Sequence, residues 1–203
     1  MKPALLFPII AAAVVAAAQA APPSSDPDWP CQQIKVPALS LTAIWAGPPV
    51  DQYLSNWSQD PAIAGLVQRL AERRLPLEEA IAAIKEYARQ SGAQKEQNLL
   101  ALFAGLFEVM DRERAEILAG LDRFGRRQKT LAETIRQENA SLQTLQADPN
   151  ANPQQVNELS TRLNWDLRVF EDRRQALTYV CSTPALVEQR LFALSRAIQE
   201  QLG

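Results

Sequence analysis

The chain has 203 residues, a formal net charge of −2 and no histidine. Its nearly balanced charge gives no long-range attraction for nucleic acid, so we expect no nucleic-acid partner. The absence of histidine removes the usual general base, the serine–histidine–aspartate arrangement and every histidine-containing metal site, and we expect neither metal nor cofactor.

The first 20 residues have the layout of a secretory signal peptide. Lys2 precedes an apolar stretch from Leu5 to Ala18, and Ala18 and Ala20 form the small-x-small pattern of a cleavage site. A retained anchor is the lesser alternative, because this stretch is shorter than the roughly 20 residues that a spanning helix needs. We therefore predict a signal peptide over residues 1–20 and a periplasmic or secreted protein with no integral membrane segment after cleavage.

Residues 21–49 contain too many prolines for a regular helix. Apolar residues such as Trp29, Ile34 and Val36 make a free disordered leader equally implausible. We expect an extended arm, with one helical turn around residues 41–45, that lies against a single helical domain formed by residues 50–203.

The two cysteines are Cys31 in this arm and Cys181 near the end of the chain. Outside the cytoplasm two cysteines most simply form a disulfide. A redox or metal-binding thiol is the lesser alternative, because neither cysteine belongs to a Cys-x-x-Cys motif. The pairing Cys31–Cys181 would dock the arm on the helical domain.

Three short helices are predicted next, over residues 50–57, 61–75 and 76–90. The first is suggested by apolar residues at helical spacing, among them Val50 and Trp57. Asp60 and Pro61 are suited to begin the second helix as N-cap and first-position proline. Pro76 breaks the pattern and begins the third helix.

Residues 96–181 predict a long helical hairpin. Apolar residues recur at alternating steps of three and four from Glu96 to Gln146, and again from Gln154 to Cys181. The residues between these stretches, Asp148 to Pro153, give a dense turn signal. We expect two antiparallel, coiled-coil-like helices, of which an arm of roughly 40 Å projects from a helical body.

The turn also fixes which positions of the two helices should face each other. Counting equal rises from a turn near Asn150 places Arg127 and Lys129 opposite Glu171 and Asp172. The same count places Cys181 beside residues 117–121, where the apolar repeat changes register and Gly120 interrupts the helix. The pattern does not decide whether the hairpin closes within one chain or between two.

Thr183 and Pro184 predict a new helix start, followed by a continuous apolar face up to Leu202. We expect this last helix and the short helices of residues 50–90 to pack on the half of the hairpin nearest the body. The predicted fold class is therefore all-α.

A second apolar strip, outside the hairpin seam, is formed by Trp165, Val169, Ala176 and Tyr179. The simpler interpretation is that the arm covers it, because exported monomers seldom leave aromatic strips bare. The alternative is a docking surface for another protein, since tryptophan and tyrosine are favoured anchors.

Three functional hypotheses follow. The first is a non-enzymatic scaffold, adaptor or assembly factor that presents a helix face to an unknown protein partner. The second is a helical-bundle sensor or carrier with a small ligand between its helices. The third is an envelope enzyme that uses carboxylates, for which Glu108 and Asp111 are three residues apart; such pairs are ordinary on a charged helix surface.

Overall fold

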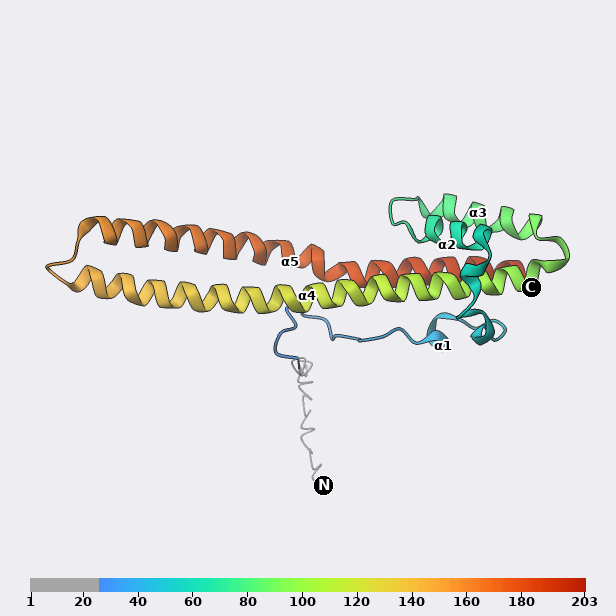
Figure 1. Ribbon diagram of the computed structural model, residues 1–203, viewed down its shortest axis with the longest axis horizontal. Coiled ribbons are helices and arrows are strands. Elements are labelled where there is room, and N and C mark those ends of the chain that lie inside the picture. Colours follow the sequence, from blue (N-terminus) through green and yellow to red (C-terminus); the bar gives the residue numbers. More distant parts are fainter. Residues whose placement is uncertain (1–25) are drawn as a thin grey trace, which may run out of the picture.

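The structure is a computed structural model, and it describes residues 26–203. The predicted signal peptide lies outside this range. Within it all regular elements are helical, which confirms the all-α fold class. Two long helices form an antiparallel pair, with the shorter elements gathered at one end (Figure 1). In chain order the elements are α1 (Leu41–Ile44), the 3₁₀ turns η1 (Asp51–Tyr53) and η2 (Trp57–Gln59), α2 (Pro61–Ala71), α3 (Leu77–Gln90), η3 (Gly92–Gln94), α4 (Lys95–Ala147) and α5 (Pro153–Leu202).

The hairpin of α4 and α5 has the predicted turn and register, and it closes within one chain. α4 contains 53 residues and is therefore about 80 Å long. The Asn152 side chain accepts a hydrogen bond from the Gln154 amide and so caps α5. Arg162 pairs with Glu138 at 2.6 Å across the two helices, at positions equidistant from the turn.

α5 does not end at Thr183, so the prediction of a separate last helix was wrong. Pro184 lies inside α5, where it lacks the amide that would bond to the Val180 carbonyl. The Ser182 and Thr183 hydroxyls donate to the neighbouring Tyr179 carbonyl at 2.7 and 3.4 Å. α5 steps toward α4 in this region (Figure 1), so the proline bends the helix and does not end it.

The core occupies the half of the hairpin that α2 and α3 cover. One buried cluster joins the start of α4 and the end of α5 to these two helices, to Trp45 of the arm and to Val50 just after it. A Cβ at Gly105 would lie 2.7 Å from atoms of Trp57 and Val67. The glycine is thus required where the arm and α2 approach α4 most closely.

The short elements differ in two details from the prediction. Residues 50–57 do not form one helix, because the 3₁₀ turns η1 and η2 are separate here. The Trp57 indole, at the start of η2, donates a hydrogen bond to the Glu108 carboxylate of α4 at 2.6 Å. α2 ends at Ala71 and not near Leu75. Arg190 of α5 donates hydrogen bonds to the Leu70 and Leu75 carbonyls, at 2.8 and 3.0 Å. It therefore supplies donors for backbone carbonyls near the end of α2.

The other half of the hairpin projects alone, and we call residues 126–147 and 153–180 the rod (Figure 1). Its buried side chains, among the described residues, are those of Glu138, Leu142 and Leu163. The seam between the two helices is therefore narrow. Most of the rod surface is accessible to other molecules.

Candidate functional site

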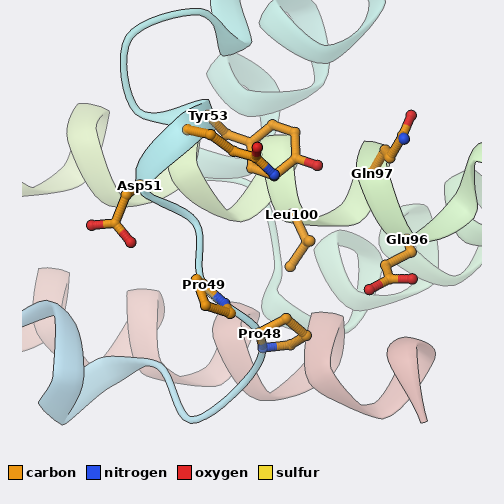
Figure 2. A pocket seen from close by; sticks show the side chains of 8 residues that line it. Pro48, Pro49, Asp51, Tyr53, Glu96, Gln97 and Leu100 are labelled. Atoms are coloured by element: carbon orange, nitrogen blue, oxygen red, sulfur yellow. The ribbon is translucent and has the colours of Figure 1, made fainter.

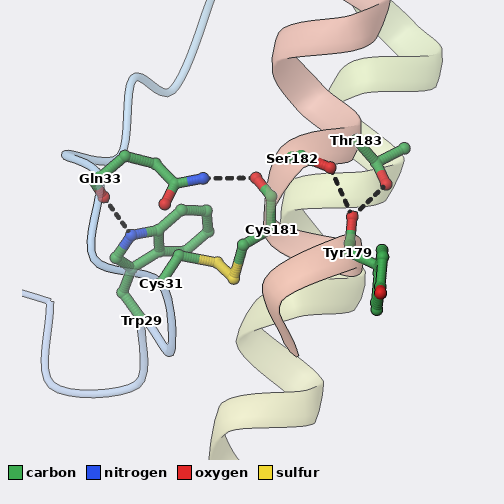
Figure 3. Close-up of a disulfide and its surroundings, with 7 residues drawn as sticks. All are labelled: Trp29, Cys31, Gln33, Tyr179, Cys181, Ser182 and Thr183. Carbon is green, nitrogen blue, oxygen red and sulfur yellow. Dashed lines mark hydrogen bonds between the residues drawn. A yellow bond between two sulfur atoms is a disulfide. The ribbon is translucent and has the colours of Figure 1, made fainter. Parts of the chain in front are cut away.

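The strip on α5 is open to solvent, and we call its residues Trp165, Val169, Ala176 and Tyr179 the outer stripe. Trp165 is 63% exposed and Tyr179 is 80% exposed, Ala176 is exposed and Val169 is half-buried. The expectation that the arm covers this strip was wrong for the described residues. The Tyr179 side chain points away from the arm, which reaches α5 from its other side (Figure 3).

The outer stripe lies outside the seam that α5 forms with α4. Val187 and Leu194 are buried in the core, but by heptad spacing they continue the seam positions of Leu159 and Val180. Trp165 and Tyr179 of the outer stripe remain exposed along the rod.

Four charged residues lie within or beside the outer stripe, and none has a hydrogen bond or ion pair among the described residues. By helical position Asp172 lies within the outer stripe, one heptad from both Trp165 and Tyr179. Asp166, Arg168 and Arg173 lie beside it. Glu171 of α5, by contrast, pairs with Arg174 one turn away. Hydrogen bonds from Arg174 and then Gln175 lower the pKa of Glu171 to about 2.

The predicted disulfide joins Cys31 to Cys181, whose Cα atoms are 5.7 Å apart (Figure 3). Trp29 packs beside it in a small buried cluster of the arm, α4 and α5. The Trp29 indole donates to the Gln33 carbonyl at 2.7 Å, and the Gln33 amide donates to the Cys181 carbonyl. Leu118 and Leu121 complete this cluster, which confirms the predicted position of Cys181.

Gly125, and not Gly120, is the glycine on which the arm rests. A Cβ at Gly125 would overlap the Asp28 carbonyl oxygen, whereas nothing but the end of the Arg123 side chain lies near Gly120. Lys129 donates to the carboxylate of Asp28 at 3.1 Å. No ion pair of Lys129 or Arg127 to α5 is present among the described residues; Lys129 pairs with Asp28 of the arm instead.

Lys35 ties the arm to α4 through two carboxylates, at 2.6 Å to Asp26 and 2.8 Å to Asp122. Hydrogen bonds to Asp122 and then to Asp26 raise the pKa of Lys35. The hydrogen bond from Lys35, followed by that from the Asp28 amide, lowers the pKa of Asp26. Ile34 and Val36 flank this lysine but are 66% and 51% exposed, so the expectation that they lie against the body was wrong.

The acidic pair proposed for catalysis holds the arm and η2 in place. Glu108 accepts from the Trp57 indole, and Asp111 accepts from the Leu39 amide at 3.2 Å. Among the described residues no group of histidine, cysteine, aspartate and glutamate is arranged to hold a metal ion.

A surface pocket of about 550 Å³ lies where the arm meets the start of α4 (Figure 2). Its lining includes Pro48, Pro49 and Tyr53 from the arm side, with Glu96 and Leu100 from α4. Glu96 is exposed and Leu100 is buried at its base. The pocket is a depression of the surface and does not enter the space between α4 and α5.

Comparison with protein-family models, with curated proteins and with solved structures found no match. Within residues 26–203 no helix is long and apolar enough to cross a membrane.

Sequence reasoning identified the outer stripe and the disulfide but missed the contacts that place the arm. Gly125 was a usable signal, since a glycine inside a long helix often marks close packing. The role of Lys35 had no such signal. Its two partners, Asp26 and Asp122, are separated by most of the arm and by the short helices.

Proposed function

We propose that this is an exported, non-enzymatic protein that presents the outer stripe of its rod to a protein partner, as a scaffold, adaptor or assembly factor. The observation that carries the proposal is the pair of exposed aromatic side chains, Trp165 and Tyr179, on a rod that needs neither for its own seam. Buried tryptophan and tyrosine anchors commonly contribute most of the binding energy at protein interfaces.

The construction of the rod supports the same function. The clasp, which is the disulfide with Trp29, Gln33 and the Lys35 ion pairs, fixes the arm at the base of the rod. The outer stripe is thereby left free along a straight helical surface. A partner helix could lie along such a surface, with Trp165 and Tyr179 separated by two heptads.

Export is supported by the disulfide and by the signal-like first 20 residues. A disulfide that closes a loop of this length would stabilise the fold by about 5 kcal/mol, provided the compartment keeps it oxidised. The periplasm or the exterior of the cell meets that condition.

The small-ligand carrier has less support. A carrier of the proposed type holds its ligand between helices, whereas the pocket at Pro48 and Glu96 is open to solvent at the edge of the body. The carboxylate enzyme has less support still, because Glu108 is engaged by Trp57 of η2 and Asp111 by the Leu39 amide of the arm.

The proposal is tested by capture from the native envelope fraction with two matched variants. Trp165→Ala removes an anchor of the outer stripe, and Leu167→Ala removes a 45% exposed side chain from another side of the same helix. We expect a stoichiometric partner with the parent chain and with Leu167→Ala, and its loss with Trp165→Ala. Equal capture by all three chains would contradict the proposal, as would catalytic turnover of an envelope substrate by the purified protein alone.

A further inference from the structure

Three arginines without a counter-charge lie together at the base of the rod, and we call Arg123, Arg127 and Arg173 the basic edge. All three are exposed, and none has a hydrogen bond or ion pair among the described residues. The ion pair between Glu138 and Arg162 sets the register of the two helices here. The same number of residues further from the turn on each helix, Arg127 of α4 comes level with Arg173 of α5.

The basic edge lies on the side of the hairpin away from the arm. The arm contacts α4 at Gly125 and α5 at Cys181. Gly125 directly follows the seam residue Phe124. Arg127 directly precedes the next seam residue, Gln128. Residues in these two places project from opposite sides of a heptad seam, so the arm leaves the basic edge uncovered.

The arginines of the basic edge are close enough to repel one another. Arg173 lies one heptad before Val180 and therefore at a seam position of α5. A side chain at such a position packs into a hole of four residues on the facing helix, which for Arg173 includes Arg127. The end of the Arg123 side chain lies beside Gly120, 3.7 Å from where a Cβ would be, one turn from Arg127. An apolar residue at position 173 would suit the seam better, so this charge is kept at a cost to the fold.

The surrounding charges leave this excess in place. Asp172 and Arg168 lie one turn apart on the outward side of α5 and balance each other. Asp166 and Glu116 each lie a full heptad, about 10 Å along the helix, from the nearest arginine of the basic edge. Arg126 and Lys129 point the other way, because both pair with Asp28 of the arm.

The basic edge is continuous with the outer stripe. Val169 and Ala176 of the stripe lie one turn before and one turn after Arg173 on α5. Both belong to the flank of α5 that faces Arg127 across the seam. A partner that packs between Trp165 and Tyr179 therefore brings one of its own edges to the three arginines.

We propose that this partner is an acidic protein segment, whose carboxylates bind Arg127 and Arg173 while its apolar side packs on the outer stripe. Guanidinium groups bind carboxylates through two parallel hydrogen bonds, which gives direction as well as attraction. Arg123 adds a third cation at the body end of the contact. This inference rests on the proposed function and names the chemistry of the partner.

The inference is tested with an N-acetylated hexaglutamate peptide and the full disulfide-bonded chain. The Nε–Hε signals of Arg127 and Arg173 should shift on titration in NMR spectra, and added salt should weaken the binding. Arg127→Gln/Arg173→Gln should raise the dissociation constant about fivefold or more. The matched control Arg89→Gln/Arg136→Gln changes the net charge equally, at exposed arginines elsewhere, and should bind like the parent chain.

Equal binding by both double variants would overturn the inference, and so would tighter binding of inorganic phosphate or phosphatidylglycerol vesicles than of hexaglutamate. Circular dichroism melting shows that each variant is folded. Arg173→Leu should leave the free energy of unfolding unchanged or raise it; a loss would assign Arg173 to the fold and contradict the proposed role. If hexaglutamate does not bind but Trp165-dependent capture of a protein persists, the acidic partner is excluded and the proposed function stands.

Discussion

The two halves of the hairpin are made of the same helices but are stabilised differently. In the half that α2 and α3 cover, α4 buries an unbroken run of residues from Leu99 to Leu106. In the rod the same helix buries Glu138 and Leu142 alone, among the described residues. The comparison shows that the heptad pattern determines which faces of α4 and α5 pack together. How much a side chain contributes to the stability of the fold depends on how many neighbouring elements bury it.

Removal of the disulfide tests the boundary between these halves and has the largest expected effect. Cys31→Ala/Cys181→Ala releases the arm where the body ends and the rod begins. We expect a loss of about 5 kcal/mol in the free energy of unfolding, measured with urea, because the disulfide closes a long loop. Chemical reduction of the parent chain should have the same effect. A loss below about 1 kcal/mol would show that the clasp contributes little beyond its non-covalent contacts.

Matched leucine substitutions test the comparison directly. Leu106 is fully buried in the body, and Leu142 is buried at the edge of the rod seam. We expect Leu106→Ala to cost about 3 kcal/mol in unfolding free energy and Leu142→Ala about 1 kcal/mol, because water can fill the space at the rod. Equal costs would mean that the rod is packed as firmly as the body.

The smallest expected effect is the response of the arm to acid. Asp26 has a lowered pKa and Lys35 a raised one, so their pairing stabilises the docked arm between about pH 3.8 and 10.5, the ordinary values of the two groups. Its contribution is lost as the pH falls through the pKa of Asp26 in the folded state. After correction for the intrinsic pH dependence of exchange, the indole proton of Trp29 should therefore become less protected as the pH falls below about 3.8.

The Trp45 indole is the control for this measurement, since it donates to the Pro48 carbonyl away from the ion pairs. Its exchange should change less over the same interval, after correction for intrinsic pH dependence. Lys35→Met should abolish the difference between the two indoles. Identical behaviour of both indoles in the parent chain would contradict the stabilising role of the Lys35 pairs.

Local and periodic features of the fold could be predicted from the sequence. The hairpin, its turn at residues 148–152 and the position of Cys181 all follow from helical repeats and equal rises along two paired helices. The outer stripe was also visible as a periodic pattern. Its exposure to solvent could not be predicted, because that depends on where the arm lies on the hairpin.

Features that depend on contacts between distant segments were missed. Pro184 was read as a helix start because a proline removes one backbone donor, yet the tertiary contacts on both sides hold α5 together through it. Ile34 and Val36 were expected to be buried for their apolar character alone. The arm turns toward α4 through Lys35 and Asp122, two residues that no local pattern connects.

The central claim is that the outer stripe serves recognition and not the fold, and neighbouring residues of α5 test it most directly. Leu163 is buried in the seam, and Trp165 is 63% exposed. At concentrations where the chain is monomeric, urea unfolding should show a loss of about 2 kcal/mol for Leu163→Ala and less than about 0.5 kcal/mol for Trp165→Ala. A loss for Trp165→Ala as large as that for Leu163→Ala would contradict the claim.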